Sequence, residues 1–245
     1  MNKVDDLRSA IELIQSIPGE YVETDVEVDP KAELSGVYRH VGAGGTVMRP
    51  TKIGPAMMFN NVKGHPGARV IIGMLASRKR VAALLDTEPE KLGFYLRDAV
   101  QHPIDPIDFT GEKAPCQEVV HYATDEGFDI RDLVPAPTNT PEDAGPYITM
   151  GLAYASDPET GISDVTIHRF CLQSKDELSM WITPGARHLG VFYDKYEKLN
   201  KPMPISISIG LDPAVYLASG FEPPTTPLGY NELGCAGAIR QKPVE

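Results

Sequence analysis

The sequence predicts an α+β protein with two domains, a mixed α+β domain over residues 1–110 and a β-rich domain over residues 111–245. Three observations support this division. The first domain alternates segments of helical apolar spacing with short strand-like runs, whereas strand patterns dominate the second. Between them, prolines and a glycine interrupt both patterns over residues 102–114, which marks a linker.

The first domain shows the signals of helices separated by short strands. Leu7, Ala10 and Ile14 follow the 3.6-residue spacing of an amphipathic helix, and Asp5 or Asp6 can cap its start. In chain order, the predicted elements are a helix that ends before residue 18, a strand at 21–28, a helix at 29–41, strands at 56–62 and 70–75, and helices at 77–87 and 88–101.

The second domain is predicted to consist mainly of antiparallel strands. Turn signals at 157–161 and 175–177 separate three strand-like runs, and a helix and a further strand follow. This order is typical of a partly open β-barrel or sandwich. A long proline-rich loop at 133–149 precedes the strands, and such loops are often functional. The predicted strands are 118–122, 148–155, 162–173, 178–183 and 205–209, and the predicted helices are 187–199, a short helix from 212, and 233–241.

Composition excludes several classes of function. The formal net charge of -11 argues against a nucleic-acid partner, because no excess of basic residues is available to neutralise phosphates. The 3 cysteines form no CxxC pair, which predicts neither a disulfide framework nor a thiolate metal site. The N-terminus has acidic residues where a signal peptide needs apolar ones, and no segment resembles a membrane span. We therefore expect a soluble cytoplasmic protein that does not bind a membrane.

Three separate predicted elements each carry one hard or borderline metal ligand, namely Asp164, His188 and Glu232. Two carboxylates and one imidazole suit manganese, magnesium or iron(II) better than metals that prefer thiolates. Residues this widely spaced in the sequence also occur by chance, so solvated or capping roles stay open for all three.

Arg169 lies inside an apolar strand-like run, next to Phe170. A buried guanidinium needs a carboxylate or phosphate partner, so a structural salt bridge is favoured and a role on a ligand stays open. Strand alternation places Asp164 and Arg169 on opposite faces of the sheet. Both can serve one site only if the strand bulges or ends between them. His168 and Trp181 are expected to be packed core side chains.

Several long segments resemble one known family. They are PAPTNTPEDAGPYIT (135–149), SDVTIHRFCLQSKDELSMW (163–181), GARHLGVF (185–192), PLGYNELGCAGAIRQKPVE (227–245) and, in the first domain, YRHVGAGGTVMRPTKIGPAMMFNNVKGHP (38–66). The chain resembles the UbiD family of reversible aromatic-acid decarboxylases along its whole length. Within this family it is most similar to the branch that acts on hydroxylated benzoates such as 4-hydroxybenzoate, protocatechuate, gallate or vanillate.

The resemblance implies a fold and a set of cofactors. Family members hold prenylated FMN in a domain built like the split β-barrel of flavin reductases, behind an α+β N-terminal domain. A divalent metal, Mn²⁺ or Mg²⁺, ties the cofactor phosphate to an Asn, a His and a Glu, and K⁺ lies nearby. Asp164 stands at the Asn position with an extra charge, and His188 and Glu232 match the other two ligands. The residues implied to bind K⁺ are Val165, Ala218, Ser219 and Phe221.

The resemblance also implies roles in flavin binding and catalysis. Arg169 matches the family's catalytic arginine, next to a flavin whose iminium accepts an electron pair from the aromatic ring. The residues implied to contact the cofactor are Asp164, Val165, Thr166, Ile167, Arg169, Arg187, His188 and Glu232. A small aromatic acid is the implied substrate, and a flavin prenyltransferase is the implied source of the cofactor.

One departure from the family concerns the end of the chain. The family pairs its arginine with two glutamates that lie further along, and this sequence stops before both, where KPVE reads as the start of a strand. We therefore expect the N-terminal and cofactor-binding portion of a carboxy-lyase, with an incomplete barrel domain. The chain would be truncated or completed by a second polypeptide, in a homo-oligomer or a larger assembly. The alternative is a non-catalytic flavin-binding or assembly subunit of a multi-subunit aromatic carboxylase.

Overall fold

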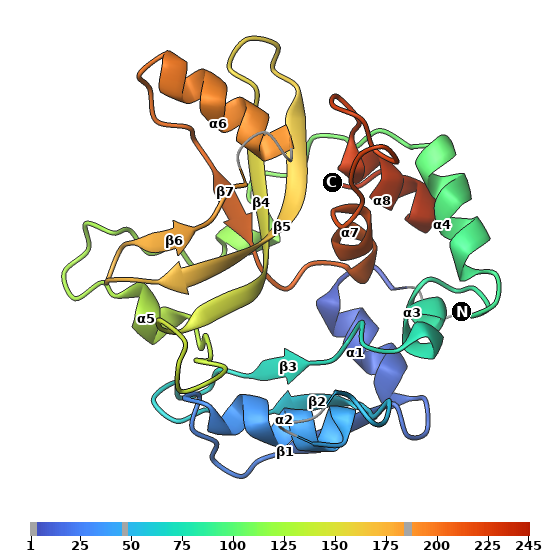
Figure 1. Cartoon of the computed structure of the whole chain (residues 1–245), viewed down its shortest axis with the longest axis vertical. Coiled ribbons are helices and arrows are strands. Elements are labelled where there is room, and N and C mark those ends of the chain that lie inside the picture. The colour runs from blue at the N-terminus through green and yellow to red at the C-terminus, as the bar shows by residue number, and fades with distance from the viewer. Residues whose placement is uncertain (1–3, 46–48, 184–187) are drawn as a thin grey trace.

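The computed structural model of the chain describes residues 4–45, 49–183 and 188–245, and it contains two β-sheets flanked by helices (Figure 1). The described strands are β1 (Tyr21–Thr24), β2 (Ala56–Phe59), β3 (Val70–Ile72), β4 (Tyr147–Ser156), β5 (Ser163–Leu172), β6 (Leu178–Met180) and β7 (Ser206–Ser208). The described helices are α1 (Leu7–Gln15), α2 (Glu33–Ala43), α3 (Arg78–Leu84), α4 (Leu92–Gln101), α5 (Ile130–Leu133), α6 (His188–Lys198), α7 (Pro213–Ala218), α8 (Glu232–Arg240) and the 3-10 turn η1 (Pro115–Gln117). The predicted mixed α+β class is confirmed.

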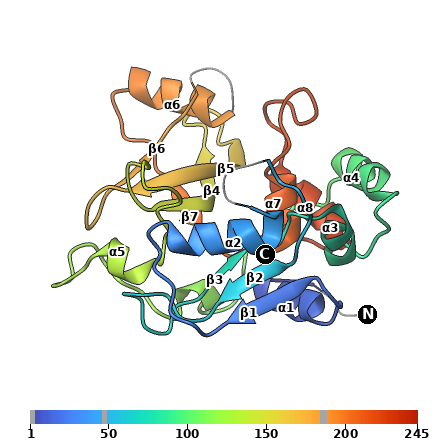
Figure 2. The ribbon, with the colours of Figure 1, turned by 60° about the horizontal axis from the view of Figure 1, so that its bottom comes forward.

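The first sheet is small and has a helix on each face. Its strand order is β1-β2-β3, with β1 parallel and β3 antiparallel to β2. On one face, Ile14 of α1 packs in a cluster with Ala56 of β2. On the other face, Leu34 of α2 packs with Met57 and Phe59. Figure 2 shows α2 lying along the strands of this sheet.

The second sheet is antiparallel and has the strand order β6-β5-β4-β7. β4 and β5 pair from Tyr147 opposite Cys171 to Ser156 opposite Ser163. β6 pairs with β5 only at Phe170–Leu172. Within the described residues, the stretch 163–169 of β5 therefore has a neighbouring strand on one side only. This free edge of β5 is central to the site described below.

A β-bulge interrupts the pairing of β4 with β5. Ile148 lies opposite Phe170 and Gly151 lies opposite His168, so β4 advances three residues where β5 advances two. The extra residue lies in β4, opposite Arg169, and β5 keeps its alternation. β5 therefore neither bulges nor ends between Asp164 and Arg169, and the irregularity belongs to the partner strand.

Different helices cover the two faces of the second sheet. α6 covers the first face, where Leu189 and Phe192 pack with Phe170 of β5. α7 and α8 cover the other face, where Ala214 and Cys235 pack in a cluster that includes Val165. Figure 1 shows these groups of helices on either side of β5.

The core beneath α7 and α8 extends into the first hundred residues. Val81 of α3 and Leu92 of α4 belong to the same cluster as Val165 and Ile239. The Tyr95 hydroxyl donates a hydrogen bond of 2.6 Å to the carbonyl of Ile239. The division at residue 110 stays a prediction, and a continuous apolar core crosses it.

One predicted strand is wrong. Residues 118–122 form no strand, and Val119 and Val120 are exposed. Local apolar content suggested a strand there, but a strand needs a neighbour that supplies hydrogen bonds. None of the helices in the described part of the chain is long and apolar enough to cross a membrane.

Candidate functional site

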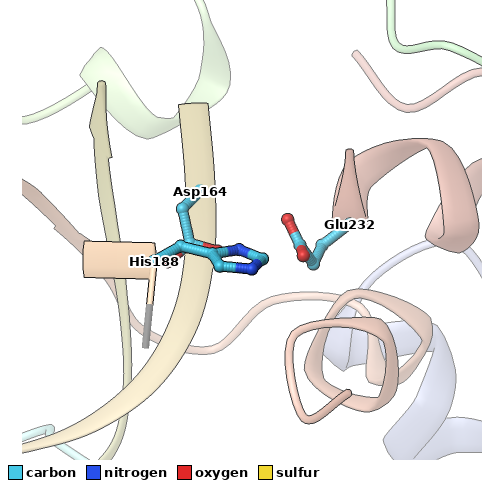
Figure 3. Close-up of side chains that lie close together, drawn as sticks. All are labelled: Asp164, His188 and Glu232. Carbon is cyan, nitrogen blue, oxygen red and sulfur yellow. The ribbon is translucent and has the colours of Figure 1, made fainter. Parts of the chain in front are cut away.

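Three side chains from separate elements converge at the free edge of β5 (Figure 3). Asp164 lies near the start of β5, His188 is the first residue of α6, and Glu232 is the first residue of α8. Their ligand atoms all lie within 4.8 Å of one another. Nδ1 of His188 is 3.5 Å from Oδ1 of Asp164. The sequence prediction that these three residues form one group therefore agrees with the geometry.

The free edge explains how α6 and α8 both reach this point. The two helices cover opposite faces of the sheet, so their side chains can meet only where the sheet ends. No strand of the described chain covers this part of β5, which leaves room for His188 from one side and Glu232 from the other. The side chain of Asn231 caps α8 by accepting from the amides of Leu233 and Gly234, which fixes the first turn that carries Glu232.

The electrostatics of the cluster favour a cation. All three side chains are buried, with exposed fractions of 4% for Asp164, 8% for His188 and 3% for Glu232. Burial raises the pKa of the Glu232 carboxyl to about 7, and the charge of Asp164 acts in the same direction. Two carboxylates buried this close together repel each other when both are ionised.

Two buried atoms of the cluster also make no hydrogen bond with the described residues, namely Nε2 of His188 and Oε2 of Glu232. Buried polar atoms without partners are costly, so such atoms point to a missing ligand. Ligands on opposite sides of a Mg²⁺ or Ca²⁺ ion lie about 4–5 Å apart, given bond lengths of roughly 2.1–2.5 Å. The spacing and the donor set therefore fit a divalent cation.

An open cleft of about 770 Å³ lies beside the same strand. Its walls come from β4, β5, the end of β6 and the proline-rich loop that was expected to be functional. The lining residues are Asn139, Thr140, Asp143, Tyr147, Thr149, Ile167, His168, Arg169, Ser179, Met180, Trp181 and Thr183. Polar and aromatic side chains therefore surround Arg169 and Ile167, two residues that the resemblance assigned to the cofactor.

Arg169 is exposed in this cleft, so the expectation of a buried guanidinium is wrong. It alternates with Phe170, which is buried on the α6 face, and it therefore points away from that core. α7 and α8 cover Val165 on this second face but leave Arg169 accessible. An accessible guanidinium can bind a carboxylate through its planar fork of donors.

Trp181 and His168 were both expected to be buried in the core, but only His168 is buried. His168 is buried, with an exposed fraction of 8%, whereas Trp181 is 76% exposed. The prediction for Trp181 is wrong because β6 ends at Met180, so Trp181 lies beyond the strand at the rim of the cleft.

The remaining residues assigned by resemblance lie close to this site. Thr166 is buried in β5, and Ile167 lines the cleft. The residues assigned to K⁺ lie at the C-terminal end of α7, in the loop that follows it and in the neighbouring part of β5, and they are Val165, Ala218, Ser219 and Phe221. The Ser219 hydroxyl donates to the carbonyl of Tyr216 over 3.0 Å. Arg187 lies outside the described residues.

Sequence reasoning missed several cleft residues, including Tyr147, Thr149 and Ser179. Alternation along each strand gives the face of a residue only when the register is known. The bulge between Ile148 and Gly151 changes that register, and nothing in the sequence marks it except the glycine.

The proline-rich loop is fixed to the first domain by two contacts. The hydroxyl of Ser35 in α2 donates a hydrogen bond of 2.7 Å to Oδ1 of Asn139. Lys31 and Thr138 form a parallel β-bridge next to it. One wall of the cleft is thus anchored to α2 and its preceding loop.

Comparison with known families gives two matches that together cover most of the chain. Residues 16–100 match the family described as 3-octaprenyl-4-hydroxybenzoate carboxy-lyase N-terminal domain, and residues 108–245 match its Rift-related domain. A curated relative, the gallate decarboxylase of Lactiplantibacillus plantarum, is 59% identical over 240 residues, which are 98% of this chain and 49% of that protein. The chain spans about half the length of the curated relatives it matches.

Solved structures show the same fold. The apo 3,4-dihydroxybenzoic acid decarboxylase of Enterobacter cloacae matches with a TM-score of 0.91 and 59% identity, over 100% of this chain and 50% of that chain. The UbiD-class enzyme HmfF of Pelotomaculum thermopropionicum, in complex with prFMN, matches with a TM-score of 0.85 and 30% identity, over 98% of this chain and 51% of that chain. The two sheets and their helices are therefore those of UbiD-type enzymes.

Proposed function

The chain belongs to the UbiD family, and from this premise we propose that it is the N-terminal and cofactor-binding portion of a decarboxylase for hydroxylated aromatic acids. The observation that carries the proposal is the buried cluster of Asp164, His188 and Glu232 beside a cleft that contains Arg169. The cluster suits a cation, and the cleft presents a cationic side chain five residues further along the same strand.

We propose that the cluster holds Mn²⁺ or Mg²⁺, and that this cation neutralises the phosphate of prenylated FMN. The donor set of two carboxylates and one imidazole supports a hard divalent cation. Thr166 and Ile167 would contact the flavin, since they follow Asp164 along the same strand. K⁺ would bind at Val165, Ala218, Ser219 and Phe221. Backbone carbonyl oxygens of these residues would be its ligands, and the packing of Val165, Ala218 and Phe221 in one cluster brings that part of the backbone together.

We also propose that the second sheet is part of a flavin-reductase-like split β-barrel. Its order β6-β5-β4-β7 leaves β6 and β7 as outer strands, to which further strands can be added. The present sheet would then be one part of the barrel, and its other part would come from residues outside this chain.

The reaction breaks the bond between the aromatic ring and the carboxylate carbon. Carbon dioxide leaves, the electron pair stays with the ring, and a proton replaces the carboxylate. Prenylated FMN, when bound, would supply an electrophile that stabilises this electron pair until the proton is added to the ring. Arg169 would bind the carboxylate of the substrate and hold the ring against the cofactor, because its guanidinium is accessible in the cleft. The proton donor would come from the part of the protein that this chain does not contain.

The names of two relatives indicate which class of substrate to test. The Lactiplantibacillus plantarum protein is a gallate decarboxylase, and the Enterobacter cloacae protein decarboxylates 3,4-dihydroxybenzoic acid. A benzoate with two or three hydroxyl groups is therefore the first substrate to test. A flavin prenyltransferase would supply the cofactor, and a cytoplasmic location would suit the three free cysteines.

Complementation tests the function. The chain is co-expressed with a flavin prenyltransferase and with the C-terminal half of the 59% identical gallate decarboxylase. Carbon dioxide release is then measured with gallate and 3,4-dihydroxybenzoate. We expect turnover only when both halves are present, and we expect Arg169→Ala to abolish it. A pair of halves that binds prenylated FMN but releases no carbon dioxide would instead favour the non-catalytic assembly subunit.

A further inference from the structure

A buried ion pair connects the turn before β5 to α6. Nζ of Lys195 lies 2.6 Å from Oδ2 of Asp157. The Asp157 side chain is 3% exposed and the Lys195 side chain is 25% exposed. Lys195 also lies 2.8 Å from Glu159, whose side chain is 63% exposed. The contact with Asp157 is therefore the shielded one, and water and salt weaken the contact with Glu159.

The two carboxylate oxygens of Asp157 make different contacts. Its Oδ1 accepts hydrogen bonds from the amides of Glu159 and Thr160, over 2.8 and 3.2 Å, which closes the turn between β4 and β5. Its Oδ2 binds Lys195 on α6. One rigid carboxylate thus joins the turn to the helix, and the pair with Lys195 holds the pKa of Asp157 below its ordinary value.

Both residues of the ion pair are close in the sequence to a residue of the cation cluster. From Asp157 the turn passes into β5, which carries Asp164 close to its start. Lys195 follows His188 by about two turns of α6, so both lie on the same side of that helix. The ion pair therefore fixes α6 relative to β5 within a short distance of the His188 and Asp164 side chains.

Apart from the contact of His188 with Asp164, α6 packs on the sheet through apolar side chains. Leu189 and Phe192 pack against Phe170 and its neighbours. Apolar packing is non-directional, so it sets the distance between helix and sheet better than it sets the position of the helix along its axis. A shift of about 1.5 Å along the helix axis, the rise of one residue, would displace His188 by the same amount relative to Asp164 and Glu232.

We propose that Asp157 and Lys195 are positioning residues that hold His188 in the geometry required for the divalent cation. The inference rests on the proposed cation site of Asp164, His188 and Glu232. Loss of a hydrogen bond made directly to a metal ligand typically weakens metal affinity about 10- to 100-fold, so a link that acts on His188 through α6 should fall at the lower end of this range. Arginine at position 195 should retain much of the effect, because it can also pair with Asp157.

The test measures Mn²⁺ binding to the 245-residue chain by electron paramagnetic resonance. Lys195→Met and Asp157→Asn should each raise the dissociation constant for Mn²⁺ about tenfold or more. Asp157→Asn keeps the oxygen that closes the turn, so it separates the ion pair from folding of the turn. Pulsed measurements should show a nitrogen coupling from His188 to Mn²⁺ in the wild-type chain and a weaker one in Lys195→Met.

Three matched variants control the experiment. Lys198→Met removes an exposed lysine from the last turn of the same helix, and Glu159→Gln removes only the exposed partner of Lys195. Both should leave the affinity for Mn²⁺ unchanged. Lys195→Arg should restore most of the affinity that Lys195→Met loses.

The outcomes separate the inference from the proposal on which it rests. A wild-type chain that does not bind Mn²⁺ would overturn the cation site, and the inference with it. If the wild-type chain binds Mn²⁺ and Lys195→Met lowers the thermal midpoint without changing affinity or nitrogen coupling, the pair is only structural. That result would overturn the inference and leave the cation site intact.

Discussion

At the scale of single residues, the pKa of the buried Glu232 carboxyl group is strongly raised. Burial raises the pKa of its carboxyl from 4.5 to about 7, with a further contribution from Asp164. A carboxyl group with this pKa is about half protonated at neutral pH, and a divalent cation must displace the proton. Cation binding and proton release should therefore be coupled at this residue.

The first prediction concerns stability as a function of pH. Without a cation, Glu232 holds its proton in the folded chain but not in the unfolded chain between pH 4.5 and about 7, because its folded pKa is the higher one. The contribution of Glu232 to stability therefore falls as the pH rises through this range, and it stays lost above pH 7. Thermal unfolding in EDTA should show this slope in the wild-type chain and a smaller slope in Glu232→Gln.

Asp164→Asn provides the matched control for this prediction. Removing the charge of Asp164 should lower the pKa of Glu232 and move the pH dependence to lower pH, while weakening Mn²⁺ binding. Parallel pH profiles for the wild-type chain and Glu232→Gln would mean that Glu232 does not have the raised pKa.

The residue scale also shows where sequence reasoning succeeds and fails. Asp164, His188 and Glu232 were assigned from ligand chemistry and resemblance, and these residues do lie together. The burial of Arg169 and Trp181 was wrong, because an apolar run says that a segment lies in a sheet but not how far helices cover each face. That coverage depends on where α7 and α8 end and where β6 stops, which are properties of the packed molecule.

At the scale of elements, β5 organises the site. Its free edge lets helices from opposite faces of the sheet reach one point, and its second face lines the cleft. Strand-like runs bounded by turn signals predicted β4 and β5 almost to their observed ends, because turn residues mark where each strand stops. The bulge could not be predicted, since one added residue in β4 leaves the local apolar pattern nearly unchanged.

The second prediction tests the close packing at the bulge. A Cβ atom at Gly151 would lie 2.5 Å from the ring of Phe170, which is 1% exposed and has little room to move. Gly151→Ala should therefore destabilise the chain by roughly 1–3 kcal/mol, as measured by urea unfolding. Gly93→Ala in α4 is the control, because nothing lies within 4 Å of its added Cβ and alanine favours helices. Equal stability of Gly151→Ala and wild type would contradict the described packing.

At the scale of the whole molecule, the first hundred residues and the last forty share a core. The Arg240 side chain joins three helices, because Nη1 donates to the carbonyl of Leu84 over 2.8 Å and Nε donates to Asp212 over 2.8 Å. Its Nη2 also pairs with Asp212. Helix and strand patterns on either side of a linker predicted two domains, yet contacts between residues far apart in the sequence decide that α3 and α4 pack against α7 and α8.

The third prediction concerns this connection. Arg240→Met keeps most of the side-chain volume but leaves Asp212, whose side chain is 12% exposed, without its cationic partner. We expect a loss of roughly 3 kcal/mol in the free energy of unfolding. The exposed pair of Lys63 with Asp29 is the comparison, since Lys63→Met should change stability by less than about 1 kcal/mol. Similar losses in both variants would contradict the special role of Arg240.

We propose, as the central point, that this chain carries the cation-dependent flavin-binding half of an aromatic-acid decarboxylase. The most direct measurement is the binding of prenylated FMN to the purified chain, with and without Mn²⁺, for wild type, His188→Ala and Glu232→Ala. We predict weak binding that requires Mn²⁺ and is lost in both variants. Binding of equal strength without Mn²⁺, or in both variants, would contradict the claim.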